Sequence, residues 1–284
     1  MRMPSSPEQI EERLQAIREW EQRYFENREM EMGSVQELQA EALSRLPEKW
    51  QKKLIEGVDR FLFYTQSMIL NANVQREVEE RILATARVFR DDITNIADVR
   101  KLTLEQNQFI RTQVVAKQRL YAFGQGGITG FGGPFLLAAD LPLIMAINLR
   151  TVQLSALAFG YDMRHPAEMM IALKVFEVGT SPSGTQYQGW KELESEEENI
   201  VGDLPGFYNG SEQVINEEWL HQPLRQIGKL AMIFMLRKKL IQGVPLIGIA
   251  YGAYSNYRLT QQVSDIASVY YEKRYLLERW HEKG

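Results

Sequence analysis

Asp140, Arg150 and Asp162 are the residues with which this chain could build a catalytic pocket. Asp140 is the only charge between Arg119 and Arg150, within Ala139-Asp140-Leu141-Pro142. An ionisable side chain in a segment that enters lipid is a functional candidate. The same side chain can instead cap a helix beginning at Leu141, with Pro142 tolerated in the first turn. Both interpretations stay open, and Arg150 is expected to be an interface residue rather than a catalytic one.

Patterns typical of known reactions are missing from the sequence. Cysteine is absent, which excludes disulfides, thiolate metal sites and a cysteine nucleophile. The three histidines have no ligand-like spacing, and the common hydrolase, metalloprotease and phosphate-loop motifs do not occur. Gly124-Gln125-Gly126 lacks the third glycine of a dinucleotide fingerprint, because position 129 is threonine. We therefore expect no metal and no cofactor, and the missing motifs make an enzyme the less favoured interpretation.

Composition and helix signals predict an all-α protein. The 284 residues are 44% apolar and 25% charged, which is typical of a globular chain, and the net charge of −4 argues against a nucleic-acid partner. Ser6, Pro7 and Gln9 form a helix-start signal, and Thr103 with Gln106 forms another, for a helix reaching about Tyr121. A further helix is expected from Val74 to about Val99. Sustained strand alternation does not occur.

The predicted organisation is an N-terminal helical extension over residues 1–55 and a helical domain over residues 56–284. One segment of this domain differs in composition, because Thr180 to Leu220 holds nine acids and one base. It is also rich in glycine and proline, so we expect an acidic loop or insertion at about 180–220. It is interpreted as a solvated linker, or alternatively as an autoinhibitory cover for a basic face.

Two glycine-rich uncharged stretches are the main functional signal, and we expect each to form an apolar helical hairpin. The first runs from Leu120 to Leu149 and the second from Leu240 to Tyr257. As a helix, the 18 residues of the second would reach ~27 Å, just short of a ~30 Å hydrocarbon core. Three alternatives stay open: hairpins packed in a soluble core, a spanning helix, and shallow membrane insertion.

The charge around the second stretch favours membrane contact. No acid occurs from Trp219 to Ser264, and anionic headgroups attract such a basic segment. Tyrosines suit the headgroup boundary. The candidate membrane-contact residues are Arg237, Lys238, Lys239, Arg258, Tyr251 and Tyr254. Alternatively, the bases balance the acidic segment and the tyrosines bond within the fold.

The N-terminal residues read as a helix start rather than as a signal peptide, because acids follow Pro7 where an apolar stretch would be needed. We expect a cytoplasmic protein, or one that is peripheral on the cytoplasmic face of the membrane.

Several short motifs, in order along the chain, resemble the EcsC protein family. The resemblance covers roughly residues 60 to 280, and the matching residues are Gly126, Gly127, Gly130, Gly133, Asp140, Pro142, Arg150, Gln153, Asp162, Pro245, Gly248, Asn256 and Tyr257. It implies a bacterial accessory protein linked to peptide export or secretion, with ABC transporter subunits as candidate partners. It carries no established catalytic residues.

Three hypotheses follow. The first is a membrane-associated accessory protein that contacts a transporter or anionic lipid. The second is an enzyme acting on a lipid or peptide substrate in a pocket between the hairpins. The third is a soluble helical scaffold whose glycines serve helix packing.

Overall fold

The computed structural model describes residues 7–26, 72–130, 133–181, 183–203 and 245–283. Near several helix ends, residues 125–130, 133–142 and 245–252 among them, only the backbone is described. Those ranges contain α-helices and one short 3-10 helix, and no strand lies within them. The all-α prediction is confirmed.

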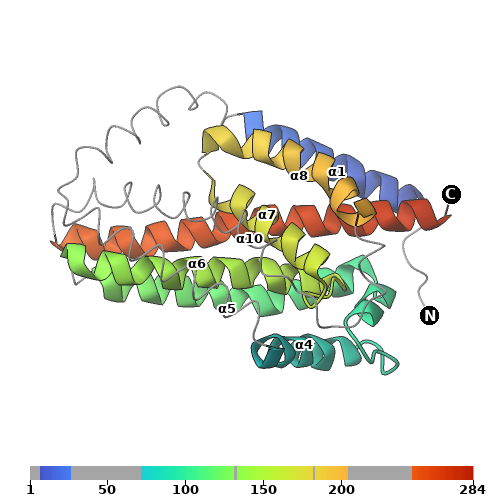
Figure 1. Cartoon of the computed structure of the whole chain (residues 1–284), viewed down its shortest axis with the longest axis horizontal. Helices are drawn as coiled ribbons and strands as arrows, with labels where there is room; N and C mark the ends of the chain where they lie inside the picture. The colour runs from blue at the N-terminus through green and yellow to red at the C-terminus, as the bar shows by residue number, and fades with distance from the viewer. Residues whose placement is uncertain (1–6, 27–71, 131–132, 182, 204–244, 284) are drawn as a thin grey trace.

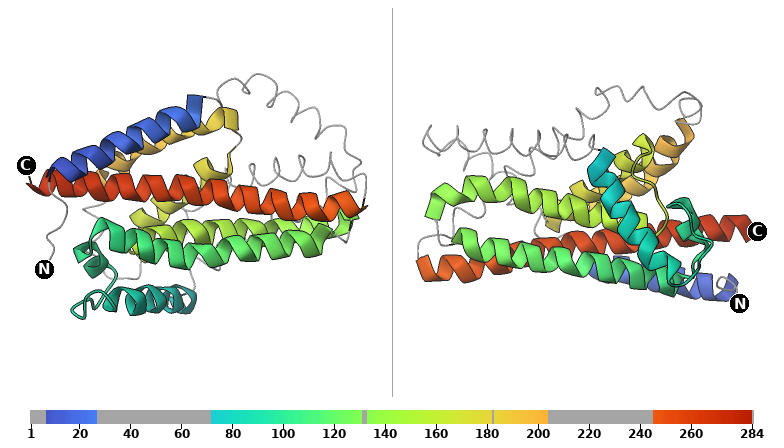
Figure 2. Two further views of the ribbon diagram at one scale, coloured as in Figure 1. Left: turned by 180° about the vertical axis from the view of Figure 1, so that it is seen from behind. Right: turned by 90° about the horizontal axis from the view of Figure 1, so that it is seen from below.

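The C-terminal helix α10 (Pro245–Lys283) is the spine of the fold. Helices α5 (Leu104–Gly130) and α6 (Gly133–Ala158) lie along it, and all three contact one another (Figures 1 and 2). Helix α7 (Pro166–Thr180) packs on α6 and α10. The core forms where these helices meet, and α10 contributes buried apolar side chains such as Val263, Ile266 and Tyr271.

Two further helices cover the C-terminal half of α10. Helices α1 (Pro7–Glu26) and α8 (Ser183–Asp203) lie side by side there, as Figure 1 shows. They share an aromatic cluster in which Trp190 of α8 lies 5.9 Å from Phe25 and 6.0 Å from Tyr270 between ring centroids. The predicted domain boundary at residue 55 lies outside the described residues.

Two predicted helix starts are confirmed by the structure. Helix α1 begins at Pro7, and α5 begins directly after Thr103. The amide of Thr103 donates to Oε1 of Gln106 at 3.0 Å, and the amide of Gln106 donates to Oγ1 of Thr103 at 3.4 Å. This reciprocal pair is a capping box. However, α5 reaches Gly130 rather than Tyr121, because packing on α6 and α10 overrides the weak helix propensity of its glycines.

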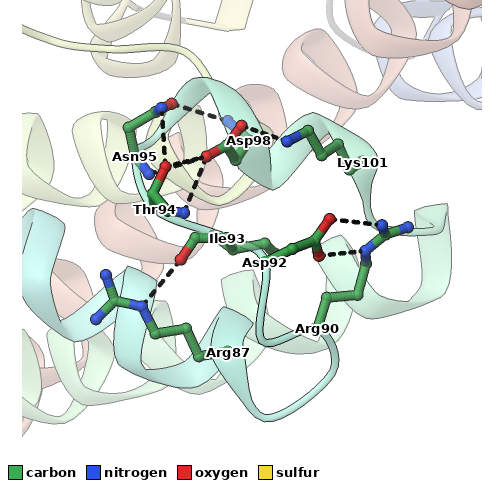
Figure 3. Close-up of polar contacts among 8 residues, drawn as sticks. All are labelled: Arg87, Arg90, Asp92, Ile93, Thr94, Asn95, Asp98 and Lys101. Atoms are coloured by element: carbon green, nitrogen blue, oxygen red, sulfur yellow. Dashed lines mark hydrogen bonds and ion pairs between the residues drawn. The ribbon is translucent and has the colours of Figure 1, made fainter.

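The predicted helix from Val74 to Val99 is too long. Helix α4 (Ala72–Arg87) ends earlier, and the 3-10 helix η2 (Ala97–Lys101) follows a polar turn (Figure 3). Nε of Arg87 donates to the carbonyl of Ile93 at 2.9 Å. Oδ2 of Asp98 accepts bonds from the amide and the hydroxyl of Thr94 at 2.9 and 2.7 Å. Side-chain bonds of this kind give the backbone an alternative to the helix.

Of the predicted loop or insertion at about 180–220, the loop alternative is wrong for the first half, because residues 183–203 form α8. The apolar residues Tyr187, Trp190 and Leu193 recur at helical spacing among the acids, and Trp190 and Leu193 are buried. Nε2 of Gln186 also donates to the carbonyl of Val178 at 3.1 Å, which ties α8 to α7. The acidic and glycine-rich composition of this segment thus obscured the apolar spacing of an amphipathic helix. The remaining residues of the predicted loop lie outside the described ranges.

Candidate functional site

The two ends of the bundle differ sharply in charge. At the C-terminal half of α10, ion pairs fix the surrounding helices. Nε of Arg13 lies 2.6 Å from Oε1 of Glu272, and Nζ of Lys273 lies 2.7 Å from Oε1 of Glu21. We call this region the ion-pair end, with Glu272, Lys273, Arg274, Glu278 and their partners as its members. Its charges are largely matched, so it holds the fold together rather than offering a free charged surface.

Tyr161, which precedes the motif residue Asp162, lies within the ion-pair end. Its ring is 4.1 Å from Cζ of Arg274 and 4.5 Å from Cζ of Arg100. Arg274 also forms two bonds to the carboxylate of Glu168, at 2.6 and 2.8 Å. Burial raises the pKa of Tyr161 well above its usual value, so the phenol stays neutral. The guanidinium groups of Arg274 and Arg100 thus pack against the ring of Tyr161, and these cation–π contacts have a structural role.

The predicted site residue Asp162 belongs to the same end. Arg164 forms bonds to both carboxylate oxygens of Asp162 at 2.5–3.1 Å, and its Nε lies 3.3 Å from Oε1 of Glu79. Burial opposes ionisation of Asp162, but the bonds from Arg164 prevail and hold its pKa below the usual value. Burial instead raises the pKa of Glu79. The guanidinium of Arg164 thus pairs with the carboxylates of both Asp162 and Glu79. Both carboxylate oxygens of Asp162 accept bonds from Arg164, so Asp162 acts as an ion-pair residue.

The opposite end of the bundle presents exposed apolar side chains. It comprises the C-terminal part of α5 and the N-terminal parts of α6 and α10, which lie together in Figures 1 and 2. We call it the apolar end, and its members are 49–71% exposed: Leu120, Tyr121, Phe123, Leu143 and Tyr254. Single exposed apolar residues are ordinary, but a group on adjoining helices indicates an interaction surface.

The charges near the apolar end are mostly positive. Residues 106–130 of α5, all of α6 and residues 245–265 of α10 contain two acids, Asp140 and Asp265. The same segments contain five bases, Arg111, Lys117, Arg119, Arg150 and Arg258. Cζ of Arg258 lies 6.0 Å from the centroid of Tyr254, so the cation and the aromatic ring adjoin. An apolar surface rimmed by bases is complementary to an anionic lipid surface.

Two guanidinium groups converge on one hydroxyl on the flank of this end. Nη2 of Arg111 lies 3.0 Å from Oγ of Ser264, and Nη2 of Arg119 lies 2.9 Å from the same atom. Nη2 of Arg119 also lies 3.4 Å from Oδ1 of Asp265. Burial and, next, the charge of Arg119 lower the pKa of Arg111 to about 10. Arg111 therefore remains cationic at neutral pH.

The structure overturns the proposed cap at Asp140. Helix α6 begins at Gly133, so Asp140 and Pro142 lie within a continuous helix and not at its start. The helix also separates two of the three residues that the enzyme hypothesis places in one pocket. Asp140 is 18 residues before Ala158, which corresponds to about 27 Å along the axis, whereas Asp162 follows that far end. Asp140 and Asp162 therefore do not meet in one pocket.

The other motif residues are distributed along the three long helices. Gly126, Gly127 and Gly130 lie in the last turns of α5, and Gly133 begins α6. Pro245 begins α10, with Gly248 and Tyr251 in its first turns. The glycine-rich hairpins stay a prediction, because the side chains in these turns are not described. The candidate contacts Arg237, Lys238 and Lys239 lie outside the described residues.

Two contacts involve motif residues. Nη1 of Arg150 donates to Oε1 of Gln153 at 3.1 Å within α6, and the expected interface role of Arg150 stays a prediction. The ring of Tyr257 lies 6.5 Å from that of Phe123, which joins α10 to α5 beside the apolar end. Asn256 is buried between helices, and Tyr254 and Arg258 are exposed as a membrane contact would require.

Sequence reasoning missed the contribution of α5, namely Phe123 and the pair Arg111 and Arg119. A signal was present, because α5 carries three bases and no acid after Glu105. The interpretation concentrated instead on Trp219–Ser264, where the absence of acids spans a longer stretch.

Within the described part of the chain, acids and histidines do not gather in groups of three or more that could hold a metal ion. An open cleft lies over the turn after α4, lined by residues 87–92, and none of the predicted site residues borders it. None of the helices described there combines the length and hydropathy needed to cross a bilayer.

Comparison with known proteins agrees with the motif resemblance. The chain is 26% identical over 252 residues to the uncharacterized protein YdbA of Bacillus subtilis (strain 168), covering 85% of this chain and 87% of the relative. It is 24% identical over 266 residues to Protein EcsC of the same organism, covering 93% and 95%. No solved structure matches the chain. The EcsC protein family matches residues 11–276, and the chain therefore belongs to this family.

Proposed function

We propose that this protein is a peripheral membrane protein whose apolar end binds an anionic lipid surface. The observation that carries the proposal is the group of exposed apolar side chains on α5, α6 and α10, with five bases and two acids around it. Apolar side chains enter the boundary between headgroups and acyl chains, while bases remain at the anionic headgroups. Both components are present on the same end of the bundle.

The expected strength is moderate. Each well-placed base near an anionic surface contributes about 1 kcal/mol. Full burial of a leucine or phenylalanine side chain contributes about 1.5–3 kcal/mol. Together these terms support reversible attachment without a spanning helix, in keeping with the absence of one among the described helices. Attachment would also bring the chain beside membrane-embedded transporter subunits, the partner class that the family resemblance implies.

The test is co-sedimentation with vesicles of phosphatidylcholine containing phosphatidylglycerol, at low and at high salt. The informative variant is Leu120→Ser, and Leu277→Ser is its matched control, because Leu277 is an exposed leucine at the ion-pair end. We expect at least tenfold weaker binding for Leu120→Ser, no change for Leu277→Ser, and weaker binding at high salt, since salt screens the bases.

Other outcomes would overturn the proposal. Equal loss for both leucine variants would mean that the apolar end has no special role. If the wild-type chain ignores the vesicles but forms dimers that Leu120→Ser abolishes, the apolar end is an interface between two copies instead. If it does neither, the soluble-scaffold hypothesis is favoured.

A further inference from the structure

The contact of Arg111 and Arg119 with Ser264 does more than join α5 to α10. Both Nη2 atoms lie within 3.0 Å of one hydroxyl oxygen, so the two guanidinium groups are close neighbours despite carrying the same charge. Like charges at such a distance repel each other, and the repulsion is stronger where water is partly excluded. Keeping two such cations together costs free energy unless an anion compensates their charge. Where no anion in the protein does so, binding of an anionic ligand can account for the unmatched charge.

The neighbouring carboxylates match the pair only in part. Asp265 lies 3.4 Å from Arg119, at the long end of an ion-pair distance. Glu272 is the other acid that acts on Arg111, but its two oxygens already accept bonds from Arg13 at 2.6 Å and Gln108 at 2.9 Å. The two cations therefore share the charge of Asp265, and the cluster keeps a net positive charge.

Unused donors accompany the unmatched charge. Each guanidinium carries five N–H donors, and the hydrogen bonds that this pair donates to Ser264 and Asp265 all use Nη2. The Nε atoms of Arg111 and Arg119 are buried and have no hydrogen-bond acceptor among the described residues. A group with several acceptor oxygens and negative charge would supply what the cluster lacks, and phosphate has both properties.

The position of the cluster fits the proposed membrane contact. Ser264 follows Tyr257 by seven residues on α10, or about 10 Å along the axis, and Tyr257 packs against Phe123 of the apolar end. The headgroup layer on each side of a hydrocarbon core is about 5–8 Å deep. With Phe123 at the acyl boundary, the cluster therefore lies near the level of the lipid phosphates. Arg119 is partly exposed, so the cluster is open on one side.

We propose that Arg111, Arg119 and Ser264 form a binding site for a phosphate group, carried by a lipid headgroup at the membrane surface. The two guanidinium forks contact the phosphate oxygens, and the hydroxyl of Ser264 holds the forks at the correct separation. The lipid source of the phosphate rests on the proposed function, whereas phosphate recognition by the cluster does not.

The variant that tests the site is Arg119→Gln, and the matched control is Lys117→Gln. Both remove one positive charge from the same turn region of α5, but Lys117 is exposed and outside the cluster. For vesicles containing phosphatidic acid, we expect at least tenfold weaker binding for Arg119→Gln and less than threefold for Lys117→Gln. Arg119→Lys keeps the charge without the fork and is expected to stay severalfold weaker than wild type. Asp265→Asn removes the competing carboxylate and is expected to bind severalfold tighter.

A second measurement distinguishes the source of the phosphate and guards against misfolding. Calorimetric titration with glycerol 3-phosphate and with inorganic phosphate is performed without vesicles, after circular dichroism has verified the helix content of each variant. Weak binding of the soluble phosphates that Arg119→Gln abolishes, together with the vesicle result, supports the proposal. Soluble-phosphate binding without any vesicle binding would retain the cluster as a phosphate site but overturn the lipid source and the membrane function. Equal weakening of vesicle binding by both glutamine variants, with no soluble-phosphate binding, would overturn the site and leave the membrane function standing.

Discussion

Gly160 lies so close to Arg100 that a Cβ at position 160 would be 2.5 Å from Cγ of Arg100. The backbone φ of Gly160 is +86°, a conformation that other residues rarely adopt. Nε of Arg100 donates to the carbonyl of Gly160 at 3.3 Å, so the arginine cannot simply move away without losing a bond. The close approach explains why a glycine precedes Tyr161 where the chain leaves α6.

Replacing this glycine is the first prediction. Gly160→Ala should lower the free energy of unfolding by about 1–3 kcal/mol, because it adds both a clash and a strained φ. The control is Gly124→Ala in α5, where no heavy atom lies within 4 Å of the added Cβ. That variant should gain up to about 1 kcal/mol from helix propensity. Urea unfolding followed by circular dichroism compares the two, and equal effects would contradict the prediction.

The second prediction concerns the hydroxyl groups of two buried tyrosines. The hydroxyl of Tyr161 has no hydrogen-bond partner among the described residues, whereas that of Tyr275 donates to the carbonyl of Leu102 at 2.8 Å. Tyr161→Phe should leave stability unchanged or raise it by up to about 1 kcal/mol, and Tyr275→Phe should lower it by about 1 kcal/mol. Thermal unfolding of both variants provides the measurement. A loss for Tyr161→Phe as large as that for Tyr275→Phe would indicate an interaction that the structure does not contain.

The third prediction is a pH dependence from Glu79. Burial raises the folded-state pKa of Glu79 above its usual value of 4.5. Between these two values the folded chain binds more protons than the unfolded chain, so stability falls as pH rises through the window. Glu79→Gln should remove this part of the fall, while Glu80→Gln, at an exposed neighbour, should retain it. Free energies of unfolding at pH 4.5, 5.5 and 7 test the sign, and parallel curves for wild type and Glu79→Gln would refute it.

The fourth prediction addresses the capping box of α5. Thr103→Ala removes the hydroxyl that accepts from the amide of Gln106 and should cost about 1 kcal/mol. Thr103→Ser keeps the acceptor and should be close to neutral. The midpoint of chemical unfolding distinguishes them, and an equal shift for serine and alanine would show that the methyl group, and not the hydroxyl, matters.

Local signals were the most predictable part of the fold. The capping pair Thr103 and Gln106 and the helix start at Pro7 depend on neighbours a few residues apart, and both were predicted correctly. The end of α4 was missed because it depends on side-chain bonds from Arg87 and Asp98 that periodicity does not reveal. Helix α8 was missed because acidic and glycine-rich composition outweighed the spacing of Tyr187, Trp190 and Leu193.

The sequence indicated which types of residue the candidate site contains, but not which residues come together in the fold. A basic, acid-poor segment with tyrosines was evident around Arg258 and Tyr254. The cluster of Arg111, Arg119 and Ser264 joins residues about 150 positions apart, so it arises only when α5 packs against α10. Conversely, the enzyme hypothesis placed Asp140 and Asp162 in one pocket between hairpins, and the rigid length of α6 keeps the two residues apart.

Helix α10 reaches from one end of the molecule to the other, and its 39 residues correspond to about 58 Å. If its first turns rest on a membrane, its last turns stand far out in the aqueous phase, with α1 and α8 attached beside them. The bundle would then act as a spacer of fixed height. Whatever binds near Trp280 would be held at a set distance from the lipid surface, independently of the affinity with which the other end is anchored.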